Sequence, residues 1–355
     1  MGAGDVRRTA EHWADALCRD REEGGGLSWH HLAPVQRRLN AKISGDEAVG
    51  WAEHVVRTHL AGRAPVPECL SLCCGRGQRE RELASAGAFA HCTAYDVSLG
   101  ALEAARAEAE RQGYPVDYRA ADMNAIELPE GAYDLILAHA ALHHLHALEH
   151  VVEQISLALK PDGLMVVQDY VGPSGFELPP RALELGDAAL RLLPERYRRS
   201  VSFARHGRVG PGAQRRPIDT LRLVWRKLHN GTLVDAAHRR MGLRRLRAEG
   251  QALVKTQIPR FTRSELAVDD PSEAVRSADI MPLLESTFDV IERRPLGGGL
   301  LWLLLDDIAA NFGEDDETAA ALLAMLFDIE DALMAAGELE SYYVFLVARR
   351  RGPDA

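Results

Sequence analysis

Long hydrophobic runs are absent from the sequence. Its apolar stretches, such as Leu300–Leu305, are far shorter than the roughly 20 residues that a membrane-spanning helix needs. The segment Met1–Glu23 is charged and carries no apolar core of the kind found in signal peptides. The sequence therefore predicts no membrane span and no secretory signal, and we expect a cytoplasmic protein.

Cysteine is scarce, and its pattern fits neither a disulfide framework nor a zinc site. An odd number of cysteines, five, argues for reduced thiols. The adjacent Cys73 and Cys74 would point to opposite faces of a strand, and no Cys-x2-Cys pair accompanies them. The sequence therefore predicts no metal site. The five cysteines are Cys18, Cys69, Cys73, Cys74 and Cys92.

The sequence has no overall excess of positive charge. Its 42 Lys and Arg residues stand against 52 Asp and Glu, for a net charge of −10, which argues against a general nucleic-acid binder. Residues 181–247 are the exception, with 17 Arg and Lys against 5 Asp and Glu. Four interpretations are open: capture of an anionic substrate such as a phosphorylated sugar, contact with a second subunit in a homodimer, contact with an anionic surface, or solvated helix faces.

The middle of the chain alternates apolar runs with helical patterns. This alternation indicates right-handed βαβ units and a doubly wound parallel sheet of the α/β class. The predicted strands are Cys69–Cys74, His91–Val97, Val116–Met123, Tyr133–Ala140 and Leu164–Tyr170, with a turn at Lys160–Gly163 before the last. The predicted helices between them are Gln78–Ala86, Leu99–Gln112 and Ala147–Leu159.

Four segments organise the chain. Residues 1–65 are predicted as N-terminal helices that cover the site, and 66–172 as the Rossmann-like core. Residues 173–268 are predicted as the basic helical insertion, and 269–355 as the completion of the core sheet. The helices expected outside the core are Val6–Glu22, Trp29–Asn40, Asp46–Leu60, most of 176–258, Pro271–Ser286, Leu300–Asn311 and Thr318–Ala336, and the strands are Phe288–Pro295 and Ser341–Arg350.

A glycine turn follows the first predicted strand. Gly75 and Gly77 allow the backbone to approach a ligand closely, as in nucleotide-type cofactor sites. Glu80 stands where a dinucleotide enzyme needs a third glycine. Asp96 and Asp122 close the next two strands, where carboxylates can bind a ribose and an adenine. Taken singly, each acid also fits a simple helix cap.

In this order the motifs resemble those of class I S-adenosylmethionine (SAM)-dependent methyltransferases over residues 66–170. The resemblance implies a seven-stranded Rossmann-like sheet with an antiparallel last strand, and SAM as cofactor. Asp169–Pro173 and Asp270–Ser277 look similar to a bacterial subgroup associated with glycan and secondary-metabolite biosynthesis. The cofactor-binding residues it implies are Cys73, Gly75, Gly77, Asp96, Val97, Asp122, Met123 and His139.

The chain departs from the family pattern at two positions of the first motif. Ser71 stands where the family usually has an acid, and Cys73 where it usually has a glycine. Glu80 or a backbone carbonyl is a possible replacement for the acid. The departures leave open a SAM-binding protein of the same fold that catalyses a non-methylating reaction or acts as an assembly partner. A nicotinamide-dependent dehydrogenase and an RNA methyltransferase fit the sequence less well.

The expected reaction is methyl transfer to a small-molecule acceptor, by O- or N-methylation of a natural-product or sugar-type metabolite. A hydroxyl acceptor needs a general base, and histidine is the commonest one near neutral pH. His139, His143 and Asp169 are the candidate catalytic residues, because they lie near the ends of the fourth and fifth strands. The candidate substrate-contacting residues are Trp29, His30 and Tyr170.

Overall fold

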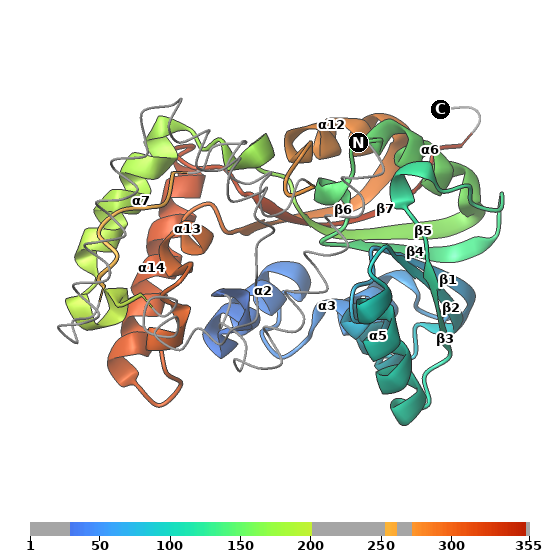
Figure 1. Ribbon diagram of the computed structural model, residues 1–355, viewed down its shortest axis with the longest axis horizontal. Coiled ribbons are helices and arrows are strands. Elements are labelled where there is room, and N and C mark those ends of the chain that lie inside the picture. The colour runs from blue at the N-terminus through green and yellow to red at the C-terminus, as the bar shows by residue number, and fades with distance from the viewer. Residues whose placement is uncertain (1–28, 201–252, 261–271, 353–355) are drawn as a thin grey trace, which may run out of the picture.

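The computed structural model describes residues 29–200, 253–260 and 272–352 (Figure 1). Its centre is one seven-stranded sheet in the order β3-β2-β1-β4-β5-β7-β6. The pairings among the first five strands are parallel, and β7 is antiparallel to both of its neighbours, as predicted. The strands are β1 (Val66–Leu72), β2 (Phe89–Asp96), β3 (Val116–Ala120), β4 (Tyr133–His139), β5 (Leu159–Tyr170), β6 (Phe288–Gly297) and β7 (Tyr343–Arg350).

Helices cover both faces of this sheet. The α-helices are α2 (Ala33–Ser44), α3 (Trp51–His54), α4 (Gln78–Ser85), α5 (Leu99–Gln112), α6 (Leu148–Ala158), α7 (Pro180–Leu192), α12 (Ser277–Thr287), α13 (Leu301–Leu305) and α14 (Glu317–Ala335). The short helices are η1 (Trp29–His31), η2 (Val55–His59), η3 (Met123–Ala125), η4 (Leu142–His144), η5 (Ser174–Phe176), η6 (Glu195–Arg198) and η8 (Ala309–Asn311). None of these described helices combines the length and the apolar composition that crossing a bilayer requires.

The two faces of the sheet follow from the alternation of side chains along each strand. On β1, Cys69 belongs to the core that includes α2, α3 and α4, whereas Leu70 belongs to the core beneath α6 and α12. Helices α6 and α12 lie side by side over that second face (Figure 1). Cys69 is paired in register with Cys92 on β2, and the four cysteines that the structure describes are free thiols, as predicted.

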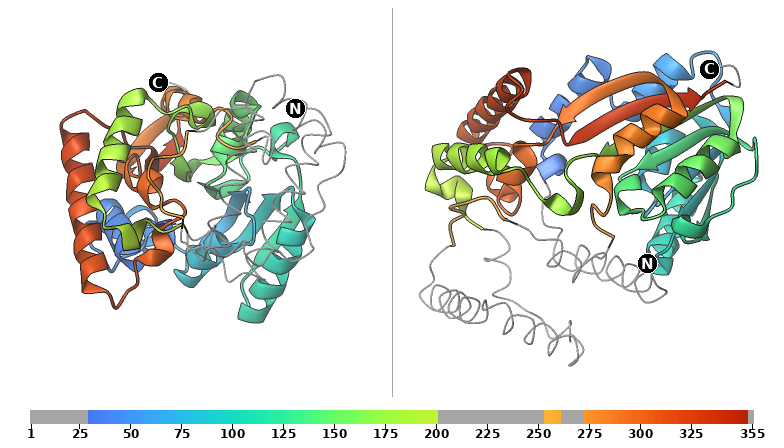
Figure 2. Two further views of the ribbon diagram at one scale, coloured as in Figure 1. Left: turned by 60° about the vertical axis from the view of Figure 1, so that its left-hand side comes forward. Right: turned by 90° about the horizontal axis from the view of Figure 1, so that it is seen from above.

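Helices α7, α13 and α14 form a second group at the end of the molecule opposite α5 (Figures 1 and 2). The fully buried side chain of Glu330 links α14 to α13 and to α2. Its Oε1 accepts hydrogen bonds from the N–H groups of Gly298, Leu300 and Leu301, at 2.9–3.1 Å. Its Oε2 accepts one from Arg38 of α2 at 3.2 Å. One carboxylate thus caps the start of α13 and holds α2 in place.

We expect Glu330→Ala to lower the free energy of unfolding by about 3–5 kcal/mol, because it leaves a buried guanidinium and three N–H groups without their acceptor. Urea unfolding of the two proteins measures this difference. Asp331→Ala is the matched control: Asp331 also pairs with Arg38, but its side chain is 50% exposed, so its loss should cost less than about 1 kcal/mol. Equal effects of the two substitutions would contradict this account of Glu330.

Several predicted helices are interrupted in the structure. The helix predicted over Trp29–Asn40 is a 3-10 turn, η1, followed by α2, because Leu32 between them is extended and Pro34 fits only the first turn of the new helix. The helix predicted over Leu300–Asn311 ends at Leu305, because Asp307 adopts a left-handed conformation (φ 64°). The turn then continues into η8 as a short 3-10 helix.

Further boundaries also differ from the sequence-based prediction, among them the strand predicted over Val116–Met123, which ends at Ala120. The helix expected over Asp46–Leu60 begins only at Trp51 and widens into a π-helix, η2. The helix expected from Pro271 is described from Ser277. The turn expected at Lys160–Gly163 is part of β5, which begins at Leu159 and passes through a register shift opposite Tyr133 and Leu135. The predicted helix Val6–Glu22 and most of the basic insertion lie outside the described residues.

Candidate active site

One cavity of about 710 Å³ opens at the carboxyl ends of the parallel strands. This edge is where open α/β sheets bind ligands. Gly77 is the one predicted site residue that does not line the cavity. The predicted residues that line it are Trp29, His30, Cys73, Gly75, Asp96, Val97, Asp122, Met123, His139, His143, Asp169 and Tyr170.

The glycine turn after β1 has the tight geometry that its sequence predicts. Gly75 and Gly77 both have positive φ, at 52° and 69°. A side chain at Gly77 would meet the Tyr118 hydroxyl at 2.1 Å, so only glycine fits there. Cys73 also has a positive φ of 51°, although it replaces the family's usual glycine. The departure at Cys73 therefore keeps the glycine-like backbone at this position.

The two acids after β2 and β3 reach the same cavity but differ in their local roles. Asp96 accepts the N–H of Gly75 at 2.8 Å through Oδ2 and that of Ser98 at 2.8 Å through Oδ1. It therefore holds the glycine turn, and Ser98 is the residue that caps α5. Burial raises the pKa of the Asp96 carboxyl, against the opposing effect of the backbone N–H groups. Asp122 does cap η3, through the N–H of Asn124 at 2.9 Å.

Glu80 places a carboxyl group beside Ser71, the β1 residue that stands where the family usually has an acid. Glu80 lies on α4 and is 1% exposed, and its carboxyl accepts a hydrogen bond from the Ser71 hydroxyl. Its Oε2 has no hydrogen-bond partner among the described residues. Burial raises the pKa of Glu80 to about 7, although the bond from Ser71 lowers it. A carboxyl group from the following helix thus lies beside Ser71.

The raised pKa of Glu80 predicts a measurable pH dependence of stability. A folded-state pKa near 7, above the unfolded value near 4.5, stabilises the protein below about pH 4.5. That contribution, about 3 kcal/mol, is lost as the pH rises towards 7 and beyond. We expect Glu80→Gln to remove this slope in urea unfolding between pH 5 and pH 7.5. Glu103→Gln, at an exposed site on α5, should leave the slope unchanged, whereas an unchanged slope in Glu80→Gln would contradict the buried acid.

His143 and Asp169 form the strongest acid–base arrangement of the cavity. Asp169 is 1% exposed at the end of β5, and its Oδ1 lies 2.5 Å from His143 Nδ1. Its Oδ2 accepts the N–H groups of Ala141 and Leu142 at 3.0 and 2.7 Å. Four donors therefore fix the carboxylate, counting the N–H of Tyr170 at 2.8 Å. With the Nδ1 proton directed at Asp169, the lone pair of the imidazole is on Nε2.

His139, at the end of β4, differs from His143 in having no carboxylate beside it. Its Nε2 is buried and has no hydrogen-bond partner among the described residues. Burial is the main cause that lowers its pKa well below the usual value, so the ring is neutral. The ring packs against Trp51 of α3 at 5.9 Å between centroids. Among the described residues, His139 therefore presents an unpaired Nε2 to the cavity wall and has no carboxylate hydrogen-bonded to its ring.

Ring contacts connect the predicted substrate residues: Trp29 contacts His30, and both Trp29 and Tyr170 contact Tyr343. Trp29 is 5% exposed and packs against Tyr343 at 5.5 Å between ring centroids. Burial, together with the neighbouring His31 and Arg79, lowers the pKa of His30 to about 4. Tyr170 donates its hydroxyl to the Pro173 carbonyl at 3.2 Å, so its ring rather than its O–H is presented to the cavity.

Sequence reasoning missed several residues of the cavity wall. Glu273 lies 3.7 Å from His143 Nε2, measured from its Oε1. It falls in the Asp270–Ser277 motif, but no spacing in the sequence links it to a histidine 130 positions earlier. Gln36, Arg79 and Tyr343 also line the cavity. Gln36 lies on α2, Arg79 on α4 and Tyr343 on β7. These elements are far apart in the sequence, and no sequence pattern reveals that they meet at one cavity.

The sheet is doubly wound, with a glycine turn after β1 and acids at the ends of β2 and β3 around one cavity. Together these features define a domain that binds a nucleotide-type cofactor. Comparison with known proteins identifies the kind of domain. Residues 70–167 match the family described as "Methyltransferase domain". Over these residues the resemblance to class I SAM-dependent methyltransferases is confirmed.

Curated relatives match the same part of the chain. A 2-phytyl-1,4-naphtoquinone methyltransferase of Nostoc sp. is 25% identical over 146 residues, which cover 40% of this chain and 63% of the relative. A 27-O-demethylrifamycin SV methyltransferase of Amycolatopsis mediterranei is 26% identical over 149 residues, which cover 37% of this chain and 52% of the relative. The chain thus spans between half and two thirds of the length of these relatives.

Similar solved structures cover more of the chain at lower identity. The phosphoethanolamine N-methyltransferase 2 of Haemonchus contortus, solved with SAM, covers 96% of this chain and 60% of its own, at 13% identity and a TM-score of 0.45. A SAM-dependent methyltransferase from Mesorhizobium loti covers 80% of this chain and 90% of its own, at 15% identity and a TM-score of 0.39.

Proposed function

We propose that this protein transfers a methyl group from SAM to a hydroxyl or amino group of a small-molecule acceptor. The observation that carries the proposal is the common cavity. The glycine turn, Asp96 and Asp122 line one part of it, and the His143–Asp169 pair lines another. Cofactor-binding groups and an acid–base pair thus open onto one space.

The cavity residues fit SAM in their chemistry and in their order along the sheet. The Asp96 carboxylate is placed to accept ribose hydroxyls while it holds the Gly75 N–H. Asp122 and the buried Met123 are placed for the adenine, by a hydrogen bond to its amine and by packing against its ring. Cys73 lines the cavity at the turn expected around the methionine end, and the buried Glu80–Ser71 pair lies behind that turn.

Bound SAM supplies an activated methyl group on its sulfonium. The protein must then hold the acceptor in line with that methyl group and remove the proton of a hydroxyl acceptor. We assign the proton transfer to His143 Nε2, with Asp169 orienting the ring and stabilising the imidazolium. His139 then contributes to the wall beside the reacting atoms without taking up the proton.

The acceptor side of the cavity favours a molecule with an apolar or aromatic body. Trp29, Tyr170 and Tyr343 supply aromatic surface there, and His30 remains neutral because its pKa is near 4. The names of the two relatives refer to a phytyl naphtoquinone and a demethylated rifamycin, which supports a small organic acceptor of the natural-product type.

In this proposal residues 1–65 cover the acceptor. Residues 66–172, completed by 269–355, hold the cofactor, and 173–268 add a basic cap that suits an anionic acceptor or a homodimer contact in a cytoplasmic enzyme.

A turnover assay tests this proposal. SAM labelled in its methyl group is incubated with the full chain and a panel of phenolic, quinol, sugar and amine acceptors, and labelled product and S-adenosylhomocysteine are measured together. Equal amounts of both, formed only with an acceptor, support methyl transfer. Binding of SAM without either product across the panel would favour a non-methylating member of the fold.

A further inference from the structure

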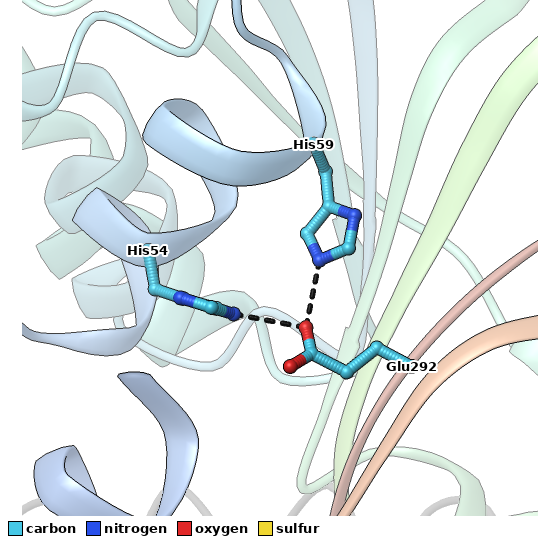
Figure 3. A group of neighbouring side chains, drawn as sticks. All are labelled: His54, His59 and Glu292. Carbon is cyan, nitrogen blue, oxygen red and sulfur yellow. Dashed lines mark hydrogen bonds and ion pairs between the residues drawn. The ribbon is translucent and has the colours of Figure 1, made fainter. Parts of the chain in front are cut away.

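Two histidines and a glutamate meet at a point outside the active-site cavity. His54 is the last residue of α3, His59 the last residue of the π-helix η2, and Glu292 lies on β6. Figure 3 shows both imidazole rings turned towards the Glu292 carboxylate. Its Oε2 lies 2.9 Å from His54 Nε2 and 2.7 Å from His59 Nε2. The two rings and the carboxylate therefore converge on one small volume.

The π-helix is what brings the two histidines together. Residues five apart in an α-helix point about 140° away from each other. The wider turn of a π-helix, with its i→i+5 hydrogen bonds, places such residues closer to one face. The bond from Leu60 N–H to the Val55 carbonyl, 3.1 Å, is of this kind. This irregular turn also explains why the spacing of His54 and His59 gave no metal signal in the sequence.

The surroundings of the cluster hold its groups in place. The three side chains are only about one tenth exposed: 10% for His54, 9% for His59 and 10% for Glu292. Arg294 donates to the other oxygen of Glu292, Oε1, at 2.7 Å, so Oε2 is the oxygen directed at the rings. Thr58 Oγ1 lies 3.4 Å from His54 Nδ1. Such outer partners orient ligands in metal sites.

We propose that His54 Nε2, His59 Nε2 and Glu292 Oε2 bind a divalent transition-metal ion of the Zn²⁺ type, with water as the fourth ligand. Two nitrogens and a carboxylate oxygen form a common ligand set for Zn²⁺. The three atoms all lie within 4.8 Å of one another. Tetrahedral ligands at about 2.0–2.1 Å from zinc are about 3.3 Å apart. The two contacts between the histidine nitrogens and Glu292 Oε2 would therefore each need to lengthen by about half an ångström.

The proposed site is structural rather than catalytic. None of its three residues lines the active-site cavity, in contrast to the other group of this kind in the described residues, His143, His144 and Glu273. Its ligands join the N-terminal helices to β6, at the edge of the sheet. Bound metal would replace two hydrogen bonds by coordination across this junction. The expected consequence is greater stability without a requirement for methyl transfer.

Metal titration of the full chain tests the proposal. The protein is stripped with a chelator, dialysed, and titrated with Zn²⁺ by calorimetry and with Co²⁺ by visible absorption. We expect one equivalent to bind, a Co²⁺ spectrum of tetrahedral type, and a higher unfolding temperature with Zn²⁺. His59→Gln and Glu292→Gln should each weaken Zn²⁺ binding by more than roughly 100-fold. Each removes a direct ligand, which should cost more than the roughly 100-fold at most that losing an outer hydrogen-bond partner costs.

His91→Gln is the matched control, because His91 also pairs with a glutamate, Glu68, at 2.9 Å, but both side chains are 44% exposed. It should bind metal as the original chain does. Absence of Zn²⁺ and Co²⁺ binding to the original chain would overturn the proposal, whatever the variants do. So would binding that His59→Gln and Glu292→Gln leave unchanged. In either case the cluster would be a hydrogen-bonded contact only.

Discussion

Asp96→Ala lowers the affinity for SAM by at least about 100-fold. The carboxylate is expected to bind the ribose, and it also accepts the N–H of Gly75 at 2.8 Å. Hydrogen bonds to a charged group contribute about 1.5–3 kcal/mol each, so losing the bonds from both ribose hydroxyls exceeds the 2.7 kcal/mol that a 100-fold change requires. Calorimetric titration with SAM measures this effect, and urea unfolding measures the separate cost to stability of losing the bonds from the N–H groups of Gly75 and Ser98.

Asp117→Ala is the control for this substitution. Asp117 is an exposed acid on β3, the neighbouring strand, that pairs with Arg119, and it should bind SAM as the original chain does. Asp96→Asn should fall between Asp96→Ala and the original chain, because an amide oxygen still accepts one hydrogen bond. If Asp96→Ala bound SAM within a few-fold of the affinity of the original chain, the cofactor would not be held by the carboxylate at the end of β2.

His143→Ala lowers kcat for a hydroxyl acceptor by about 10²–10⁴-fold and leaves SAM affinity unchanged, because the ring removes the proton only during the transfer. Asp169→Asn should lower kcat as well, since an amide at its position cannot stabilise the imidazolium. Turnover is measured with labelled SAM over a range of pH. The residual rate of His143→Ala should rise with pH, because a more ionised acceptor needs the base less.

His91→Gln serves as the control here too, since it removes an exposed histidine far from the proton transfer. His139→Gln separates the two candidate bases. If His139 only forms the wall, its substitution changes KM more than kcat. A kcat that depends on His139 but not on His143 would contradict the assignment of the base. A rate of His143→Ala that is flat with pH would point instead to a structural role of the ring.

The core sheet, and the cavity at its edge that most of the predicted site residues line, could be predicted from the sequence, because both rest on local patterns. Apolar strand segments, helices between them and acids at strand ends are visible in a single chain. The interrupted helices could not be predicted, because the left-handed Asp307 and the π-turn of η2 follow from tertiary packing. The same holds for Glu273, which reaches His143 through the fold and not through a motif.

Ser71 has a neighbour in the structure that bears on a question raised by the sequence. The family's acid is missing there, and the sequence left Glu80 and a backbone carbonyl as possible replacements. The structure places the Glu80 carboxyl on the Ser71 hydroxyl. In the sequence, position 80 stood out as the place of an absent third glycine and as one candidate replacement for the acid. Its second role depends on how α4 packs against β1, which no pattern in the sequence describes.

Calorimetric titration of the unaltered full chain with SAM tests the central claim most directly, because every assigned residue of the site depends on cofactor binding. We predict one SAM bound per chain with a dissociation constant on the order of micromolar, and binding of S-adenosylhomocysteine at the same site. The absence of heat and of competition at SAM concentrations up to the millimolar range would contradict the account.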